Sequence, residues 1–224
     1  MTPLGLFAKA PIPGKTKTRL SPEIGAEGAA TLYRSFVRDT VDTCLRLGRV
    51  KVSLWQATAH PFLETLAEQR GLESRMQCDG DLGVRMGSAL DEMLTRHGRG
   101  ILIGTDTPTL PISLLELAVA ALDSAELVLG PSADGGFYLI GARGRSPELR
   151  GIAWSSKDTL RDTLLQNPRG ARVLPPWYDV DRPPDLRLLR THLALDEAAA
   201  PHSRACLQDQ APASEGFDPH GEPG

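Results

Sequence analysis

The sequence predicts an α/β protein in which helices cover both faces of a mostly parallel, Rossmann-like central sheet, giving a three-layer α/β/α sandwich. Short apolar runs alternate along the chain with amphipathic stretches of helical period. This alternation implies parallel strands that are joined by right-handed crossovers. The unbroken apolar run GILIG at residues 100–104 is typical of a central strand that is buried on both faces.

The first strand is expected at residues 4–8, where LGLFA forms an apolar run. Pro11 and Gly14 exclude a helix directly after it, and Ser21, followed by proline, opens one. That helix carries apolar residues at helical spacing and ends at Gly48. The elements expected next are a strand at 50–55, a helix at 61–69, a strand at 75–78 and a helix at 82–94.

The second half of the domain is expected to begin with the central strand at 100–104. Pro111 suits the first turn of a helix that runs to Leu122, and a strand follows at 126–129. A turn-rich loop, GPSADGG, then leads into a strand at 137–141. The remaining expected elements are a helix capped by residues 155–158 and ending at 165, extended pieces at 173–174 and 178–181, and a last helix at 183–195.

The chain of 224 residues is long enough for one substantial core, and we expect a single domain over residues 1–195. From about residue 196 the apolar periodicity stops, and Ala, Pro, Gly, Ser and acidic residues take over. Such a composition cannot bury enough apolar surface to fold by itself. Residues 196–224 are therefore expected to form a disordered tail.

Charge and cysteine content exclude several classes of protein. The formal net charge of -3 argues against non-specific binding to nucleic acids or membranes, so an anionic partner should be small. The three cysteines show no CxxC spacing, which argues against a disulfide framework or a structural zinc site. The amino terminus lacks the pattern of a signal peptide, and no apolar run reaches the ~18 residues of a membrane span. We expect a cytoplasmic protein; its oligomeric state is open.

The loop after the first strand carries four cations, Lys9, Lys15, Lys17 and Arg19. Cations at the carboxyl end of a strand lie where open α/β sheets bind ligands, and they suit phosphate. The alternative is a set of solvated surface charges. A Walker A motif is excluded, because its spacing would require glycine at the position of Lys9.

Acidic residues follow later strands in three turns, around Asp106, Asp134 and Asp181. Carboxylates opposite a cationic loop suit a nucleotide phosphate bridged by a divalent ion, Mg²⁺ or Mn²⁺. Asp106 and Asp181 together would satisfy magnesium, which takes one or two carboxylates besides phosphate oxygens. Each carboxylate also has a purely structural interpretation, as a turn residue or a helix cap.

Six motifs in order resemble the nucleotide-diphospho-sugar transferase superfamily, which has the GT-A fold, and within it the small bacterial glycosyltransferase-like DUF2064 proteins. The resemblance covers residues 4–190. The motifs are FAKAPIPGKTKTRL at residue 7, GDLGVRM at 80, IGTDTP at 103, GPSADGGFYLIG at 130, WSS at 154 and DVDRPPDL at 179.

The resemblance implies a role for each motif. The loop from Ala8 to Arg19 would wrap the nucleotide, and Asp106 would hold the metal ion. Thr-Asp-Thr stands here in place of an Asp-x-Asp pair, so the second ligand is open, with Asp181 first and Asp134 in reserve. The implied catalytic residues are Lys17, Arg19 and Asp106; the implied metal ligands are Asp106 and Asp181; the implied nucleotide-binding residues are Ala8, Lys9, Gly14, Lys15, Lys17, Arg19, Gly80, Asp81, Gly83, Arg85, Asp134, Gly135 and Gly136.

Three of these motifs can also be interpreted from the residues themselves. The turn from Gly80 to Arg85 could present backbone N–H groups to a base or phosphate, or could be an ordinary helix start. Gly135 and Gly136 would allow close backbone approach to an acceptor or sugar. Trp154 is a candidate wall of the acceptor pocket, although a lone tryptophan is more often a core residue.

The expected function is a metal-dependent transferase that uses a nucleoside triphosphate or a nucleotide-diphospho-sugar. The density of cations in the first loop favours a triphosphate, and hence nucleotidyl transfer onto a small phosphorylated or hydroxyl acceptor. The name of the family that the chain resembles favours the alternative, a glycosyltransferase that uses a nucleotide sugar. A non-catalytic nucleotide-binding protein is the alternative of another class.

Overall fold

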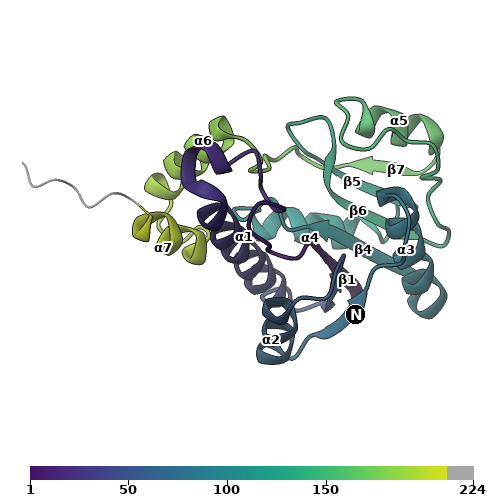
Figure 1. The fold of residues 1–224 in the computed structure, drawn as a ribbon. Coiled ribbons are helices and arrows are strands. Elements are labelled where there is room, and N and C mark those ends of the chain that lie inside the picture. The colour runs from purple at the N-terminus through teal and green to yellow at the C-terminus, as the bar shows by residue number, and fades with distance from the viewer. Residues whose placement is uncertain (211–224) are drawn as a thin grey trace, which may run out of the picture.

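A seven-stranded sheet forms the middle layer of the computed structural model, which describes residues 1–210 (Figure 1). The strand order is β3-β2-β1-β4-β6-β5-β7. Neighbouring strands are parallel except at β6, which is antiparallel to both β4 and β5. The strands are β1 (Thr2–Ala8), β2 (Val50–Gln56), β3 (Glu73–Met76), β4 (Arg99–Gly104), β5 (Leu127–Pro131), β6 (Phe137–Arg143) and β7 (Ala171–Val173).

Helices cover both faces of this sheet, which confirms the predicted three-layer α/β architecture (Figure 1). The helices are α1 (Ser21–Leu45), α2 (Pro61–Arg70), α3 (Leu82–His97), α4 (Ile112–Ala121), α5 (Thr159–Gln166), α6 (Pro183–Leu195) and α7 (Pro201–Asp209). Side chains alternate across the strands, so Leu6 and Ile103 belong to one buried cluster and Leu102 to another. The first cluster contains residues of α1, α2, α4, α6 and α7. The second contains residues of α3, and Leu160 and Leu164 of α5 pack against it.

The central strands β1 and β4 position the candidate site. Both are parallel, so their carboxyl ends reach the same edge of the sheet, with Phe7 opposite Gly104. The chain proceeds from β1 through α1 to β2 on one side, and returns through α3 to β4 on the other side of β1. The strand order therefore reverses between β1 and β4, and such a point opens a crevice at the carboxyl edge.

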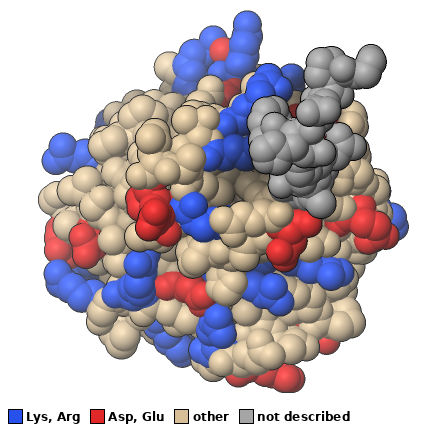
Figure 2. Space-filling view, turned by 90° about the vertical axis from the view of Figure 1, so that its left-hand side faces the viewer, with Lys and Arg blue, Asp and Glu red and all other residues tan. Residues whose placement is uncertain are grey.

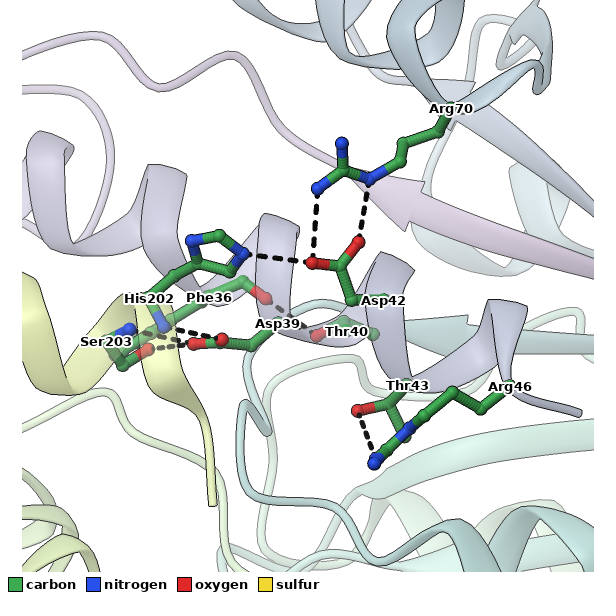
Figure 3. Close-up of polar contacts among 9 residues, drawn as sticks. All are labelled: Phe36, Asp39, Thr40, Asp42, Thr43, Arg46, Arg70, His202 and Ser203. Atoms are coloured by element: carbon green, nitrogen blue, oxygen red, sulfur yellow. Dashed lines mark hydrogen bonds and ion pairs between the residues drawn. The ribbon is translucent and has the colours of Figure 1, made fainter. Parts of the chain in front are cut away.

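Helix α7 differs from the expected disordered tail. It packs against α1, where Ser203, Cys206 and Leu207 are buried. Figure 3 shows why it is held: Asp39 of α1, which is 2% exposed, accepts hydrogen bonds from the backbone N–H groups of His202 and Ser203, each 2.9 Å long, and from the Ser203 hydroxyl. A carboxylate of α1 thus satisfies the first backbone donors of α7.

A second carboxylate of α1, Asp42, reinforces this contact. It accepts two hydrogen bonds from Arg70 of α2, at 2.8 and 3.2 Å, and lies 2.9 Å from Nε2 of His202 (Figure 3). The described chain therefore continues the domain through residue 210, beyond the expected boundary at 195. The rest of the expected tail, residues 211–224, lies outside the described residues.

Charged residues are distributed over the surface of the molecule. On the face shown in Figure 2, cations and carboxylates are interspersed on the part that the described residues form. None of the helices within residues 1–210 is long and apolar enough to cross a membrane. Cys44, Cys78 and Cys206 are all free; Cys78 is exposed and the other two are buried.

Candidate functional site

The loop between β1 and α1 is held by hydrogen bonds to its own backbone and to the core. The Thr16 hydroxyl, which is buried, donates to the carbonyl of Ala10 at 2.6 Å. The backbone N–H of Lys9 donates to the Tyr33 hydroxyl at 2.9 Å. Lys17 has a φ of 51°, in the left-handed region that non-glycine residues rarely adopt. The loop is therefore fixed at both ends and turns sharply at Lys17.

That turn places the ammonium of Lys17 between two carboxylates. Nζ of Lys17 lies 2.7 Å from Oδ1 of Asp106 and 2.5 Å from Oδ1 of Asp181. The Lys17 side chain is 4% exposed, whereas those of Asp106 and Asp181 are 39% and 35% exposed. The backbone N–H of Val180 donates to the carbonyl of Asp106 at 2.9 Å, which fixes the two acidic segments side by side.

Within this triad of Lys17, Asp106 and Asp181, the surroundings shift the pKa values of Lys17 and Asp181 so that both stay charged. Burial would lower the pKa of the Lys17 ammonium, but the charges of Asp106 and Asp181 outweigh it and raise the pKa above its ordinary value. Burial would likewise raise the pKa of Asp181, but the adjacent Lys17 ammonium lowers it. Lys17 thus holds the two carboxylates in place. The family resemblance implies in addition that the Lys17 ammonium is aimed at phosphate, and this stays a prediction.

Tyr33 of α1 is a site residue that the sequence pattern did not distinguish from core. The Tyr33 hydroxyl lies 2.7 Å from Oγ1 of Thr105, the residue that precedes Asp106 in the chain. It also accepts a hydrogen bond from the backbone N–H of Lys9. The Lys17 ammonium lies 5.9 Å from the centre of its ring. Burial, then the charge of Asp106, raises the pKa of Tyr33 to about 12, so the hydroxyl stays neutral. Tyr33 therefore ties the first loop to the end of β4.

A cavity of about 240 Å³ lies beside the triad, and we call it the cationic cavity. Its lining includes Lys9, Lys15, Lys17 and Arg19 together with Asp106 and Asp181. Within residues 1–210, Lys9, Lys15 and Arg19 make no ion pair with a carboxylate, in contrast to Lys17. Three cations are therefore available to an anion in this cavity.

On the other side of the triad lies a cavity of about 210 Å³, which we call the acidic cavity. Its lining includes four carboxylates, those of Asp106, Asp134, Asp179 and Asp181. Burial, and then the charges of Asp134 and Asp181, raise the pKa of Asp179 to about 7. The sequence analysis did not select Asp179 as a site residue, because the shift of its pKa depends on its burial and on Asp134, which lies in a loop that is distant in the sequence.

A third cavity, of about 400 Å³, adjoins both and is the apolar cavity. Its apolar lining includes Phe7, Leu82, Met86, Leu139 and Ile140. Its polar lining residues include Lys9, Gln77, Asp81, Arg85, Asp106 and Ser155. Nη1 of Arg85 donates to Oε1 of Gln77 at 3.2 Å. Its mixture of apolar surface and a few polar groups is typical of a small-molecule site.

The turn from Gly80 to Arg85, which was expected to bind the nucleotide, also begins helix α3. Asp81 accepts from the backbone N–H of Val84 at 2.9 Å and so caps α3. Gly83 allows close packing, since a Cβ there would lie 2.6 Å from the carbonyl oxygen of Leu149 and 2.7 Å from the ring of Trp154. The expected binding residues Asp81 and Arg85 both line the apolar cavity, whereas Gly80 and Gly83 shape the helix start.

The glycine loop after β5 packs against another part of the chain. Gly135 has a φ of +92°, and a Cβ there would lie 2.2 Å from the carbonyl oxygen of Lys157. Its close approach is therefore to the segment around Lys157, and Gly136 donates its N–H to Asp134 at 2.9 Å. The expected helix cap at 155–158 is instead a turn, with Ser155 at a φ of 60°, and α5 begins at Thr159. This turn lines the acidic cavity.

Of the remaining expected site residues, Ala8 is buried and lines the apolar cavity, and Gly14 has a φ of +71° in the first loop.

A divalent metal ion would find a limited set of protein ligands at this site. Within residues 1–210 no three His, Cys, Asp or Glu side chains gather at one point. The pair Asp106 and Asp181 fits Mg²⁺ or Mn²⁺ only together with phosphate oxygens and water.

Comparison with solved structures supports the fold. The chain is 30% identical to a protein of Desulfovibrio desulfuricans G20 assigned to the nucleotide-diphospho-sugar transferases, with a TM-score of 0.84 over 93% of this chain and 95% of that one. It also resembles a CMP:2-keto-3-deoxy-manno-octonic acid synthetase complexed with CTP, at 13% identity and a TM-score of 0.55, over 87% of this chain and 99% of that one.

A third similar structure is glucosyl-3-phosphoglycerate synthase from Mycobacterium tuberculosis in complex with Mg²⁺ and UDP. Its identity is 11% and its TM-score 0.52, over 96% of this chain and 81% of that one. At this identity it shows the fold alone. A comparison with curated proteins found no match.

The family comparison agrees with the motifs. Residues 40–156 match the family described as "Uncharacterized protein conserved in bacteria (DUF2064)". The match covers more than half of the chain, and it includes the end of β4 with Asp106 and the turn around Asp134. The chain belongs to the DUF2064 family, within the nucleotide-diphospho-sugar transferase superfamily, as its sequence motifs predict.

Proposed function

We propose that this protein is a nucleotidyltransferase that uses a nucleoside triphosphate and a divalent metal ion, Mg²⁺ or Mn²⁺. The observation that carries this proposal is the arrangement of the first loop. Lys9, Lys15 and Arg19 are free of carboxylate partners within the described residues and line one cavity with the pair Asp106 and Asp181. Three available cations suit the charge of a triphosphate better than that of a diphosphate.

Each cavity has a role in this proposal. The donor's phosphates occupy the cationic cavity, and its base occupies the apolar cavity, whose polar lining includes Gln77 and Arg85. Lys17 acts as a positioning residue, because its buried ammonium holds Asp106 and Asp181 at the border between donor and acceptor. The metal ion, bound by these carboxylates and by phosphate oxygens, would neutralise charge on the phosphates.

The proposed reaction is a direct in-line displacement. The acceptor oxygen forms a bond to the α-phosphorus, while the bond from that phosphorus to the bridging oxygen breaks. Pyrophosphate leaves with the electron pair of that bond, and the acceptor's proton passes to water. Lys9, Lys15 and Arg19 stabilise the charge that gathers on the leaving group.

Glycosyl transfer from a nucleotide sugar is the second candidate. It is favoured by the 30% identity to the Desulfovibrio protein, which is assigned to the nucleotide-diphospho-sugar transferases. The same cavities would serve it, with the nucleoside diphosphate as leaving group. The two candidates therefore differ in the phosphate product that is released.

Phosphorus-31 NMR distinguishes the candidates. The protein is incubated with each nucleoside triphosphate and each nucleotide sugar, with Mg²⁺ and a mixed pool of acceptors. Release of pyrophosphate from one triphosphate is expected. Release of a nucleoside diphosphate from a nucleotide sugar would replace the proposal by glycosyl transfer, and the absence of any turnover, water included, would contradict both.

Two variants test the cationic cavity in the same assay. Lys15→Gln removes one available cation, and we expect it to raise the KM for the donor about tenfold. Lys51→Gln is the matched control, because Lys51 lies on β2 with a side chain that is 65% exposed, outside all three cavities. An equal effect of the two substitutions would refute the assignment of this cavity to the donor.

A further inference from the structure

We propose that the acceptor is an uncharged polyhydroxyl molecule, such as a sugar or polyol without phosphate or carboxylate groups, and that it binds in the acidic cavity. This inference rests on the proposed function and adds the class of the second substrate. It narrows the sequence-based expectation, which left a phosphorylated acceptor open.

Most of the charged residues that line the cationic cavity are cations, whereas most of those that line the acidic cavity are carboxylates. Of the four carboxylates in the acidic cavity, Lys17 engages Asp106 and Asp181, and Lys9 is the one cation in the lining of this cavity among the described residues. Asp134 and Asp179 have no ion-pair partner within residues 1–210. A phosphorylated or carboxylated acceptor would bring its negative charge beside Asp134 and Asp179, which neither Lys17 nor the metal ion proposed at Asp106 and Asp181 neutralises, and like charges repel in a half-buried site.

The other lining groups suit hydroxyl-rich ligands. Phe137 and Trp154 meet edge to face, with ring centres 6.2 Å apart at an angle of 83°. Both line the acidic cavity, and their apolar surfaces can cover the C–H groups of a sugar ring or polyol chain. Carboxylate oxygens and the hydroxyls of Ser155 and Ser156 supply acceptors and donors for several ligand hydroxyls.

An unsatisfied hydroxyl provides a second, independent observation. Thr107 lines the acidic cavity and is 3% exposed, yet its Oγ1 has no hydrogen-bond partner in the part of the chain that the structure describes. The indole N–H of Trp154 is likewise buried without a partner there. Buried polar groups are nearly always paired, so an unpaired hydroxyl and an unpaired indole N–H in the wall of a cavity are groups that a bound water or a ligand would pair.

Thr109 shows how the same residue type behaves when its role is structural. It is 6% exposed, and its hydroxyl donates to the Tyr178 hydroxyl at 2.9 Å and accepts from the Trp177 indole at 3.3 Å. Thr107 and Thr109 are therefore a matched pair on one loop. The Thr109 hydroxyl has two partners within the fold, whereas the Thr107 hydroxyl has none among the described residues.

The position of the acidic cavity suits an attacking hydroxyl. The acidic and cationic cavities share Lys9, Asp106, Ser155 and Asp181, so they meet at the carboxylate pair. A hydroxyl of a ligand in the acidic cavity thus faces the phosphates of a donor in the cationic cavity. The bond changes are those given for the proposed reaction, with a carbon-bound hydroxyl as the attacking group.

Matched pairs of acceptors test the inference. Glycerol is compared with glycerol 3-phosphate, D-glucose with glucose 6-phosphate, and D-mannose with mannose 6-phosphate, using the donor that the protein turns over and scoring transfer of its labelled group. We expect transfer to at least one neutral compound, at least tenfold faster than to its phosphorylated counterpart.

The opposite results overturn it. Equal or faster transfer to a phosphorylated counterpart contradicts the inference. The inference is also contradicted if the protein binds a donor and slowly hydrolyses it with water, but transfers the group to none of the neutral compounds. In that case the proposed function stands and the inference about the acceptor fails. A protein that binds no donor refutes the proposed function itself, and this inference with it.

Two isosteric substitutions test the free hydroxyl. Thr107→Val should lower kcat/KM for the neutral acceptor about tenfold without lowering Tm, and Thr107→Ser should restore it. Thr109→Val should lower Tm, because it removes a hydroxyl that two side chains use. If Thr107→Val lowers Tm as Thr109→Val does and leaves kcat/KM unchanged, the Thr107 hydroxyl stabilises the fold and does not bind the acceptor, and the inference fails.

Discussion

Replacing Lys17 by methionine removes the buried ammonium but keeps most of the length of the side chain. Asp106 and Asp181, each within 2.7 Å of that ammonium, then face each other without a cation between them. The substitution therefore measures how much Lys17 contributes to holding the carboxylate pair.

The expected loss of stability follows from burial. Removing one partner of a fully buried ion pair costs about 3–5 kcal/mol. Here the Lys17 side chain is 4% exposed, but both carboxylates are more than one-third exposed and can take up water when the ammonium is gone. Solvent therefore reduces the cost, and we expect about 2 kcal/mol, or a Tm lower by roughly 6 °C for a chain of this length.

The pH dependence has a definite sign. In the wild type the pKa of Asp181 is lowered: burial opposes the shift, and the Lys17 ammonium overcomes it. This contribution to stability is present above the ordinary carboxyl pKa of ~4 and is lost as the pH falls through the lowered pKa. Without the ammonium, burial raises the pKa of Asp181, so the deficit of Lys17→Met should be largest near neutral pH and should shrink toward pH 4.

Urea unfolding at several pH values between 4 and 8 measures this difference. The matched control is Lys51→Met, whose side chain is 65% exposed and whose loss should change stability by less than about 0.5 kcal/mol. If Lys17→Met were as stable as Lys51→Met at neutral pH, or if its deficit grew on acidification, the role assigned to the Lys17 ammonium would be refuted.

Three further substitutions have expected outcomes. Tyr33→Phe leaves the Lys9 N–H unsatisfied and should cost about 1–2 kcal/mol in urea unfolding and weaken donor binding in calorimetry; unchanged values in both would contradict its role as a tie between loop and strand. Gly135→Ala, whose Cβ would lie 2.2 Å from the Lys157 carbonyl oxygen at a φ of +92°, should cost at least about 1–3 kcal/mol, and a neutral result would contradict the close packing of the two loops. Asp39→Ala should speed hydrogen exchange in α7 and leave donor affinity unchanged; protection of α7 equal to the wild type would show that Asp39 does not hold it.

Much of the architecture could be predicted from the sequence, because its signals are local. The run GILIG identified a central strand, and the polar segments after the apolar runs identified the carboxyl edge of the sheet. The expected pairing of Asp106 and Asp181 in one place follows from the same rule, and the structure brings them to one ammonium.

What the sequence could not predict depends on contacts between distant segments. Tyr33 has the spacing of a core residue in a helix, and only its hydroxyl contacts reveal its link to the site. Helix α7 lacks a clear apolar stripe, and it is held by Asp39 of α1. The burial of Lys17 and the perturbed pKa of Asp179 arise likewise from the packed loops. No local pattern encodes these features.

The most direct test of the account is isothermal titration of each nucleoside triphosphate and nucleotide sugar, with Mg²⁺, into the wild type and the double variant Lys15→Gln/Arg19→Gln. The account predicts that one triphosphate binds with one-to-one stoichiometry, and that the double variant, which keeps the Asp106–Lys17–Asp181 triad, weakens this binding at least tenfold. Binding that is unaffected by the double variant, or the absence of binding by every triphosphate, would contradict it.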